Sequence, residues 1–358
     1  MKIVVFCGGF GTRMWPASTK SNPKQFAPIL NGKSFYRLTL DRFEKRFDPK
    51  DIYISTEIRY KAIAMEQAKE LPEQNFIFEP ERRDTMAAVG LVLAKLKTTG
   101  DDTVFFSWSD HIIDQEEVFL DAVELSLSLT KQTGLPVSIN QPPLYPTTQN
   151  GWVKLGAKKE KKGEFDVFEI DDFVEKPTSS IAQKLFKSKE YLVHTGYGSW
   201  PINFLWDEYQ KNAPDAFKLL QKISQVIEGG GFLEIGNLYG QIEKQSVDYA
   251  VFEKIPKGQR LTISAKFGWK DAGTWQLLFD ALSRDNQTVN LSNVNLVEIS
   301  SSGNLVSTSN SRVVSLVGVS GIAVIEINGA ILVLDLSKSS EVKDLYMSLE
   351  SLYPETVS

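Results

Sequence analysis

The sequence predicts an α/β fold, with a mostly parallel mixed sheet flanked by helices, followed by a smaller β-rich unit. Up to about residue 140, short apolar runs typical of strands alternate with segments of helical length. This alternation indicates βαβ units with right-handed crossovers. From about residue 290, short β-rich pieces separated by Ser, Gly and Asn follow one another before a final helix. We therefore expect two domains, residues 1–284 and residues 285–358.

The first domain is expected to place a ligand site at one edge of its sheet. Its expected strands are 2–7, 51–56, 75–79, 102–110, 134–140, 151–159 and 164–177. Its expected helices are 34–47, 57–71, 82–98, 115–132, 179–188 and 203–212. In open α/β sheets, ligands bind at the carboxyl ends of the strands. The glycine-rich "GGFG" at 8–11 and "SDH" at 109–111 both lie at strand ends, which favours a functional role for each.

The second domain is expected to be built from repeated short strands. These are 293–300, 304–309, 311–319, 321–329 and 330–336, with a helix at 340–351. Repeated strands joined by turns are typical of a β-helix or a small sandwich. Because no exact sequence period holds, the pattern alone leaves both architectures open.

Composition excludes several classes of protein. The net charge of −5 argues against the clustered basic surface that nucleic-acid-binding proteins carry. Cys7 is the only cysteine, which excludes a disulfide framework and leads us to expect a cytoplasmic setting. With only His111 and His194, a histidine-rich zinc or iron site is not expected, and a metal would be Mg²⁺ on carboxylates. The apolar run at 321–336 contains Glu326 and Gly329, so it is not expected to span a membrane.

The stretch "GGFGTR" at 8–13, with Lys24 beyond it, allows two interpretations. It matches neither the P-loop spacing nor the dinucleotide-binding fingerprint. In the first interpretation, the backbone N–H groups of the glycines after the strand bind an anion. Arg13 adds several N–H donors in one plane, and Lys24 adds a single positive charge. The alternative is a tight turn after a buried strand, with both basic residues merely solvated. The local residues leave both interpretations open.

Six segments in order resemble the mannose-1-phosphate guanylyltransferases, a family of nucleotide-sugar pyrophosphorylases. The stretch "GGFGTRMWPASTKSNPKQF" (8–26) is similar to the family's signature loop. The others are "EPERRDTMAAV" (79–89), "SDHII" (109–113), "DDFVEKP" (171–177), "SVDYAVFEK" (246–254) and "GWKDAGTW" (268–275). The resemblance spans residues 1–284, and the tail looks like the family's short left-handed β-helix. It implies a Rossmann-like sheet of the nucleotide-diphospho-sugar transferase type.

The resemblance implies the transfer of GMP from GTP to mannose 1-phosphate, with release of pyrophosphate. Such a reaction needs positioning, cations and a metal rather than a covalent nucleophile. Arg13 and Lys24 are then expected to hold the triphosphate, and Asp110 and Asp271 to hold Mg²⁺. The alternatives are a turn residue or a helix N-cap for Asp110 and a plain turn residue for Asp271.

The same resemblance implies a nucleotide site near the glycine loop. Guanine presents N1–H and an exocyclic NH₂ side by side, a pair of donors that suits a carboxylate. Glu79 and Asp84 are the candidates to bind that edge, although Asp84 stands where the family has Asn and is equally interpreted as a helix N-cap. The expected nucleotide-binding residues are Gly8, Gly9, Gly11, Thr12, Glu79, Asp84, Thr85 and Ser109.

A sugar-phosphate site is implied by the later segments. Glu175 is expected to bind sugar hydroxyls and Lys176 to neutralise the phosphate, the alternative being a surface pair before a helix. Asp248 serves the sugar or the metal, or caps the following helix. The expected sugar-phosphate-binding residues are Gly151, Glu175, Lys176, His194, Gly196 and Asp248.

Three departures from the family pattern bear on the substrate. His194 stands where the family has Asn, and Trp108–Ser109 replaces Pro-Ala. The stretch "NGWVKLG" at 150–156 stands in for the family's GYGYI and keeps Gly151 but not the second glycine of that motif. They leave open another manno-configured sugar 1-phosphate, such as a heptose phosphate. A catalytically silent regulatory protein that binds nucleotide sugar is the alternative from a different class, although Arg13 and the carboxylates are retained. The apolar β-rich tail further suggests a homodimer formed through the second domain.

Overall fold

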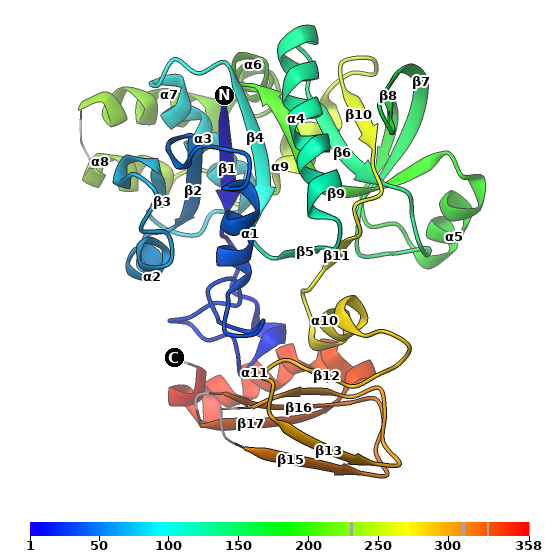
Figure 1. The fold of residues 1–358 in the computed structure, drawn as a ribbon. Helices are drawn as coiled ribbons and strands as arrows, with labels where there is room; N and C mark the ends of the chain where they lie inside the picture. Colours follow the sequence, from blue (N-terminus) through cyan, green and yellow to red (C-terminus); the bar gives the residue numbers. More distant parts are fainter. Residues whose placement is uncertain (230–231, 309–311, 328, 358) are drawn as a thin grey trace.

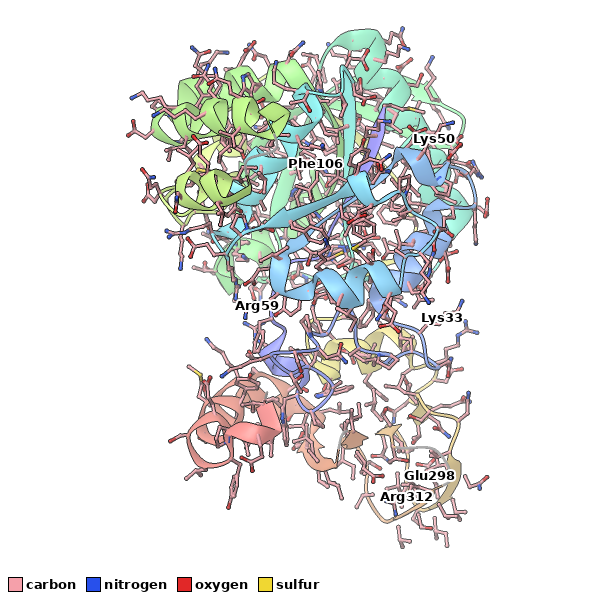
Figure 2. All side chains as sticks on the ribbon, turned by 90° about the vertical axis from the view of Figure 1, so that its left-hand side faces the viewer. Lys33, Lys50, Arg59, Phe106, Glu298 and Arg312 are labelled. Carbon is pink, nitrogen blue, oxygen red and sulfur yellow. The ribbon has the colours of Figure 1, made fainter. Side chains whose placement is uncertain are left out.

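The computed structural model describes residues 1–229, 232–308, 312–327 and 329–357, which form two bodies (Figure 1). The upper body in Figure 1 is the α/β part, and the lower body contains the C-terminal strands. Figure 2 shows Phe106 inside the larger body and Glu298 with Arg312 in the smaller one. The predicted fold class is confirmed. Residues 309, 311 and 328 of the expected strands, and residue 358, lie outside the described residues.

A nine-stranded mixed sheet forms the centre of the larger body, in the order β3-β2-β1-β4-β9-β6-β10-β8-β7. β1, β2, β3 and β4 are parallel neighbours, as are β6 and β10, whereas β8 and β9 run in the opposite direction. The sheet is therefore mostly parallel. Its strands are β1 (Lys2–Phe6), β2 (Ile52–Glu57), β3 (Phe76–Glu79), β4 (Thr103–Trp108), β6 (Val137–Gln141), β7 (Trp152–Lys162), β8 (Phe165–Val174), β9 (Tyr191–Pro201) and β10 (Leu261–Ser264).

Helices cover both faces of this sheet because its central strands are apolar on both sides. In β1, Ile3 and Val5 belong to one buried core, while Val4 and Phe6 belong to the other, as the alternation of side chains along a strand requires. The helices of the first core are α1 (Phe35–Phe43), α2 (Lys61–Glu66) and α4 (Glu116–Thr133). Those of the second are α3 (Asp84–Lys97), α6 (Ile202–Asn212), α7 (Pro214–Gly229), α8 (Phe232–Tyr239) and α9 (Val247–Ala250).

The structure adds elements that the sequence does not predict. The central strand β9 is the most important of these, because it lies between β4 and β6 and pairs antiparallel with both. β10, α7 and α8 also fall outside the predicted elements. The expected helix 57–71 is shorter, a 3-10 turn at Ile58–Tyr60 followed by α2. The predicted helix 179–188 is present as α5 (Ser179–Ser188).

The smaller body has the stacked parallel strands of a β-helix. β13 pairs in parallel with β15, and β14 with both β12 and β16. Asn295 lies beside Val313 and Leu305 beside Ala323, each pair 18 residues apart. Its elements are β12 (Val289–Asn290), β13 (Asn295–Ile299), β14 (Leu305–Ser307), β15 (Val313–Val317), β16 (Ile322–Ile327), β17 (Ala330–Asp335) and α11 (Val342–Leu352). Of the two expected architectures, this arrangement is the β-helix-like one.

A third buried core joins the two bodies. It combines residues of the loop after the glycines with α10 (Trp275–Leu282), the C-terminal strands and α11. The indole N–H of Trp275 donates to the carbonyl of Trp15 at 2.9 Å, and that of Trp15 donates to the carbonyl of Thr356 at 3.1 Å. The C-terminal body therefore packs directly against the loop that carries the predicted phosphate-binding residues.

The domain boundary at residue 284 stays a prediction. We propose it as a division of the sequence only, because the third core contains residues from both sides of it. Among the described residues, no helix is long and apolar enough to cross a membrane.

Candidate active site

The glycine loop begins where β1 ends, at the carboxyl edge of the parallel strands. Gly11 has a φ of 67°, and a Cβ at this position would lie 2.7 Å from Cγ of Lys24. Only glycine tolerates both the positive φ and this close approach, so the backbone of Gly11 packs directly against the aliphatic part of the Lys24 side chain. Arg13 follows in a 3-10 turn (Thr12–Met14) and is exposed to solvent.

Lys24 and Asp110 form an ion pair at this edge. Nζ of Lys24 lies 2.7 Å from Oδ2 of Asp110, and the Lys24 side chain is buried. Burial opposes ionisation of Asp110, but Lys24 and His111 outweigh it and lower the pKa of Asp110 to about 2. Burial likewise opposes the charge of Lys24, whereas Asp110 and Asp271 raise its pKa. Both groups are therefore charged at neutral pH.

A small two-stranded sheet brings Asp271 beside Asp110. β5 (His111–Ile113) pairs antiparallel with β11 (Trp269–Asp271), and His111 lies opposite Asp271. Asp110 directly precedes β5, so the two aspartates lie at neighbouring positions in this sheet. The helix N-cap interpretation of Asp110 is wrong, because a strand follows it, whereas Asp110 does lie in a turn. Asp271 ends a strand, which the turn interpretation did not include.

These two aspartates fit a divalent cation that is shared with a phosphate ligand. Mg²⁺ binds through one or two carboxylates and completes its shell with phosphate oxygens and water. The contact between Lys24 and Asp110 shows that this carboxylate already attracts a cation. Among the described residues, no group of three or more His, Cys, Asp or Glu side chains is placed to hold a metal without other ligands. A cation held by these two aspartates would take its remaining ligands from a substrate or from water.

One pocket extends from the glycine loop toward the start of α3, and we call it the loop pocket. The predicted nucleotide residues Gly8, Gly9, Glu79, Asp84 and Thr85 line it, together with Asp110. Glu79 is buried at the end of β3, and the hydroxyl of Tyr239 donates to its Oε2 at 2.7 Å. Burial raises the pKa of Glu79 to about 7. Its carboxyl group therefore changes charge close to neutral pH.

Asp84 and Thr85 shape the turn at which α3 begins. Asp84 has a φ of 64°, is exposed, and accepts a hydrogen bond from the N–H of Thr85 at 2.7 Å. Oγ1 of Thr85 accepts a hydrogen bond from the N–H of Val247 at 2.9 Å, which fixes this turn to α9. The N-cap interpretation of Asp84 is wrong, because the N-cap of α3 is Arg83 and Asp84 is the first residue of the helix. Asp84 makes only a local contact with Thr85, while it also lines the loop pocket.

The loop pocket also contains residues that the sequence reasoning missed. They are Glu57, Arg59, Tyr60 and Arg82. Trp108, which the sequence shows as a departure from the family pattern, lines the same pocket at the end of β4. Arg59 lies at the lower side of the larger body in Figure 2. The signal available in the sequence is position, because Glu57 directly follows a predicted strand and Arg82 begins a predicted helix at the ligand-binding edge. Their polarity alone does not distinguish them from surface residues.

A second pocket, which we call the central pocket, lies on the other side of Asp110 and Trp108. It brings together most of the predicted sugar-phosphate residues and both aspartates: Gly151, Glu175, Lys176, His194, Gly196, Asp248, Asp110 and Asp271. Asp110 and Trp108 line both pockets. Two ligands that occupied these pockets would therefore meet at Asp110.

Five of the predicted site residues are not part of the described lining of either pocket: Gly11, Thr12, Arg13, Lys24 and Ser109. Ser109 is buried, and its N–H donates to the carbonyl of Phe6 at 3.1 Å. Lys24 reaches the site through its contact with Asp110. Ser109 therefore has a structural contact that the sequence interpretation did not consider.

Three ionisable residues of the later segments line the central pocket: Glu175, Lys176 and Asp248. Nζ of Lys176 lies 3.2 Å from Oε1 of Glu175. Burial, followed by repulsion from Asp248, raises the pKa of Glu175. The capping interpretation of Asp248 is wrong, because the N-cap of α9 is Ser246, whose hydroxyl accepts a hydrogen bond from the Asp248 N–H.

His194 is held in one tautomer by its neighbours on the sheet. Nδ1 lies 3.1 Å from Oδ1 of Asn140, whose amide nitrogen donates to Ser138 and Thr262. Oδ1 is therefore the acceptor and Nδ1 carries the proton. Burial lowers the pKa of His194, which leaves a neutral ring with Nε2 as an acceptor.

Trp108 and Gly196 interlock where the two pockets meet. The indole N–H of Trp108 donates to the carbonyl of Gly196 at 3.0 Å. Gly196 has a φ of 80°, and a Cβ there would lie 2.4 Å from Nε1 of Trp108. The ring also stacks on Phe6 with 5.1 Å between ring centroids. The indole is therefore fixed from both sides.

Comparison with known protein families agrees with this geometry. Residues 2–288 match the model of the family described as nucleotidyl transferase. The chain belongs to the nucleotidyl transferase family. Residues 294–349 match a second model, described as the MannoseP isomerase/GMP-like beta-helix domain, which confirms the β-helix-like architecture of the smaller body.

Individual relatives cover almost the whole chain. The alginate biosynthesis protein AlgA of Pseudomonas syringae pv. tomato is 28% identical over 97% of this chain and 71% of its own length. A mannose-1-phosphate guanylyltransferase of Klebsiella pneumoniae is 27% identical over 95% of this chain and 72% of its own. A solved structure described as mannose-1-phosphate geranyltransferase from Thermus thermophilus is 26% identical, with a TM-score of 0.87, and covers 98% of this chain and 99% of its own.

Proposed function

We propose that this protein transfers GMP from GTP to mannose 1-phosphate, which yields GDP-mannose and pyrophosphate. The observation that carries the proposal is the meeting of two pockets at Asp110, one beside the glycine loop and one lined by Glu175, Lys176 and Asp248. Membership of the nucleotidyl transferase family supports the reaction class, and the relative from Klebsiella pneumoniae supports the substrates.

In this reaction the two anionic substrates react in line. A phosphate oxygen of the sugar phosphate attacks the α-phosphorus of GTP, and the bond from that phosphorus to the bridging oxygen breaks, so that pyrophosphate leaves. The backbone of the glycine loop and Arg13 neutralise the triphosphate, and Lys24 keeps positive charge beside Asp110. The protein contributes position and charge rather than a covalent nucleophile.

Asp110 and Asp271 would hold Mg²⁺ between the two pockets. The ion would neutralise phosphate charge in the complex. Asp110 suits this role because its lowered pKa keeps it ionised down to a low pH. Lys24 and Asp110 keep each other charged before any substrate binds.

Glu79 is the carboxylate that we assign to the guanine edge. It is buried in the loop pocket, whereas Asp84 is exposed and bonded to its own helix start. An ionised Glu79 accepts from both N1–H and the exocyclic NH₂ of guanine. On the sugar side, Glu175, Asp248 and Nε2 of His194 supply acceptors for hydroxyl groups, and Lys176 supplies charge for the phosphate.

The test is pyrophosphate release with Mg²⁺, crossing GTP, UTP, dTTP and ATP with mannose 1-phosphate and glucose 1-phosphate. We expect release with GTP and mannose 1-phosphate, and none after chelation of the metal. Turnover with another nucleotide would contradict the assignment of guanine. A folded protein that binds GDP-mannose without turnover would instead be a regulatory relative.

We further propose that two copies associate through the smaller body. Val297 and Ile299 of β13, with Val313 and Val317 of β15, leave an exposed apolar face on this parallel pair, and we call it the β13–β15 face. Apolar side chains on neighbouring exposed strands are typical of an interface. A second copy would cover the same face by two-fold symmetry.

A further inference from the structure

The end of the loop pocket near β2 and β3 holds two carboxylates side by side. Glu57 and Glu79 are register partners at the last positions of these parallel strands, and both line the pocket. Glu57 already has a partner, because the guanidinium of Arg59 pairs with its Oε1. The same guanidinium lies 5.5 Å from the ring centroid of Tyr60. Arg59 is therefore held in place by Glu57 and Tyr60.

Arg82 is the guanidinium that remains beside Glu79. It lies in the loop between β3 and α3, lines the loop pocket and is exposed, so a ligand can reach it. It makes no hydrogen bond or ion pair with the part of the chain that the structure describes. Burial raises the pKa of Glu79 and that of Tyr60, and the positive charge of Arg82 opposes both shifts. Arg82 therefore lies near both groups, with its N–H donors open to a ligand.

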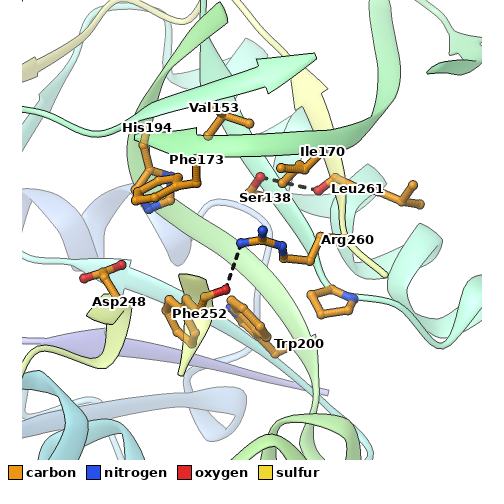
Figure 3. Close-up of a pocket in the computed structure, with 11 residues that line it drawn as sticks. Ser138, Val153, Ile170, Phe173, His194, Trp200, Asp248, Phe252, Arg260 and Leu261 are labelled. Atoms are coloured by element: carbon orange, nitrogen blue, oxygen red, sulfur yellow. Dashed lines mark hydrogen bonds between the residues drawn. The ribbon is translucent and has the colours of Figure 1, made fainter. Parts of the chain in front are cut away.

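A cavity that borders the central pocket at His194 is less suited to a base (Figure 3). Its walls include the apolar side chains of Val153 and Ile170. Arg260, the arginine in its lining, donates to the carbonyl of Phe252 at 2.9 Å, as the dashed line in Figure 3 shows. A base edge with several polar groups needs polar partners, so the loop pocket is the better match.

The polar groups of guanine fit Glu79 and Arg82 in their order along the base edge. The exocyclic NH₂ and N1–H are donors that suit the Glu79 carboxylate, and O6, which follows N1–H, is an acceptor that needs a donor. Adenine carries an NH₂ where guanine carries O6, and an acceptor where guanine carries N1–H. A donor next to Glu79 therefore distinguishes the two purines at a group that the carboxylate does not contact.

We propose that Arg82 donates to O6 of guanine while Glu79 accepts from N1–H and the exocyclic NH₂, and that this pair selects guanine over adenine. This inference rests on the proposed function and names a second residue of its base site. With ATP, the NH₂ would face the guanidinium, donor against donor, and N1 would face the carboxylate, acceptor against acceptor. A site built to hydrogen-bond one arrangement rejects a ligand that leaves its polar groups unpaired.

The experiment compares GTP, 6-thio-GTP and ITP as substrates with mannose 1-phosphate and Mg²⁺. 6-Thio-GTP has sulfur, a weaker acceptor, in place of O6 and keeps N1–H and the NH₂. ITP keeps O6 and N1–H and lacks the NH₂. We expect kcat/KM for 6-thio-GTP to be about tenfold lower than for GTP. Equal values for these two nucleotides in the wild-type chain would overturn the inference.

Variants of the two arginines test which guanidinium contacts O6. Arg82→Met should lower kcat/KM for GTP about tenfold and for 6-thio-GTP less than about twofold, while the ratio of GTP to ITP stays as in the wild-type chain. Arg59→Met should keep the ratio of GTP to 6-thio-GTP, because Glu57 already holds that guanidinium. Arg312→Met, which changes an exposed arginine paired with Glu326 in the smaller body, is the matched control and should change neither rate nor ratio.

Two results with these variants would contradict the assignment. Equal losses for GTP, 6-thio-GTP and ITP in Arg82→Met would mean that Arg82 binds the phosphates or stacks on the base instead of contacting O6. Loss of the ratio of GTP to 6-thio-GTP in Arg59→Met alone would move the contact to Arg59. If Arg82→Met does not fold, Arg82→Ala gives the same comparison.

The proposed function fails separately, if no nucleotide is turned over with mannose 1-phosphate. Calorimetric titration of the full chain with GTP and with 6-thio-GTP then decides the inference. Tighter binding of GTP that is lost in Arg82→Met supports the contact with O6, and equal affinities in the wild-type chain contradict it.

Discussion

At the scale of single residues, two buried carboxylates of the same site differ in charge because their neighbours differ. Asp110 has Lys24 within 2.7 Å, and its pKa is lowered to about 2 in spite of burial. Glu79 has the uncharged hydroxyl of Tyr239 as its close partner, and burial raises its pKa to about 7. The first is suited to hold a cation, and the second is suited to bind donors only above neutral pH.

Glu79 makes stability depend on pH in a defined direction. Its folded pKa lies above the unfolded value of 4.5, so the folded state binds the extra proton between these two pH values. The free energy of unfolding should therefore fall as the pH rises from 4.5 to 7, by about 3 kcal/mol. Chemical denaturation of Glu79→Gln across this range should show a flatter profile, and an identical profile would contradict the shift.

Glu79 also predicts how the affinity for GTP changes with pH. The ionised carboxylate accepts from two guanine donors, whereas the protonated group presents one donor and fewer acceptors. The KM for GTP should fall by about tenfold between pH 6 and pH 8. Glu79→Gln should raise KM and remove this dependence. A KM that depends equally on pH in the variant would assign the titration to another group.

Asp271 offers the clearer test of the metal site, because its replacement leaves the Lys24–Asp110 pair intact. Asp271→Asn should lower kcat by at least about 100-fold, with a higher Mg²⁺ concentration needed for half-maximal rate. Asp114→Asn is the control, since Asp114 is exposed and pairs with Lys270 at 2.7 Å. An unchanged Mg²⁺ dependence in Asp271→Asn would remove Asp271 from the metal site.

At the scale of elements, β9 shows where sequence patterns fail. Its sequence, "YLVHTGYGSWP", contains two glycines and no regular alternation of apolar and polar residues, so it does not predict a strand. The structure nevertheless places it at the centre of the sheet, where His194 and Gly196 line the central pocket. His194 and Gly196 interrupt the expected strand pattern, and both are residues that line the central pocket.

Gly196 allows this element to be tested directly. Gly196→Ala places a Cβ 2.4 Å from the Trp108 indole nitrogen in a backbone with φ 80°, which should displace the ring from between the pockets. We expect a loss of about 2–3 kcal/mol of stability and a rise in KM for both substrates. Gly163→Ala has a φ of 59° with open space around it, and should cost only about 1 kcal/mol. Equal effects of the two changes would mean that Trp108 has no role.

At the scale of the whole molecule, the sequence predicts the family and the two-part architecture better than it predicts which distant residues come together in a pocket. Ordered segments such as "GGFGTR" and "GWKDAGTW" indicate the family and place Asp271 in the site, because they require particular residues at particular spacings. Glu57 and Arg82 could not be predicted, since only the fold brings them to one pocket. The 18-residue stacking in the smaller body is visible in the register of β13 and β15 but not as a sequence repeat.

The sharing of one core by the two bodies also lies beyond the sequence. Trp15 and Trp275 pack with residues of the C-terminal strands, so the smaller body helps to hold the loop that leads to Lys24. The dimer proposed above would form on the same body that packs against this loop.

The last prediction concerns this association. Ile299 and Val317 are direct partners in the β13–β15 face, and both are more than half exposed. Ile299→Lys combined with Val317→Glu introduces opposite charges across one strand pair, which keeps the strands paired while making the face polar. Sedimentation of the full chain should show a dimer, and the double variant should sediment as the 40.2 kDa monomer. Ile331→Lys on β17, another exposed apolar position, should leave the dimer intact, because it lies outside this face. A wild-type chain that sediments as a monomer would contradict the proposal, and loss of the dimer in Ile331→Lys alone would move the interface to β17.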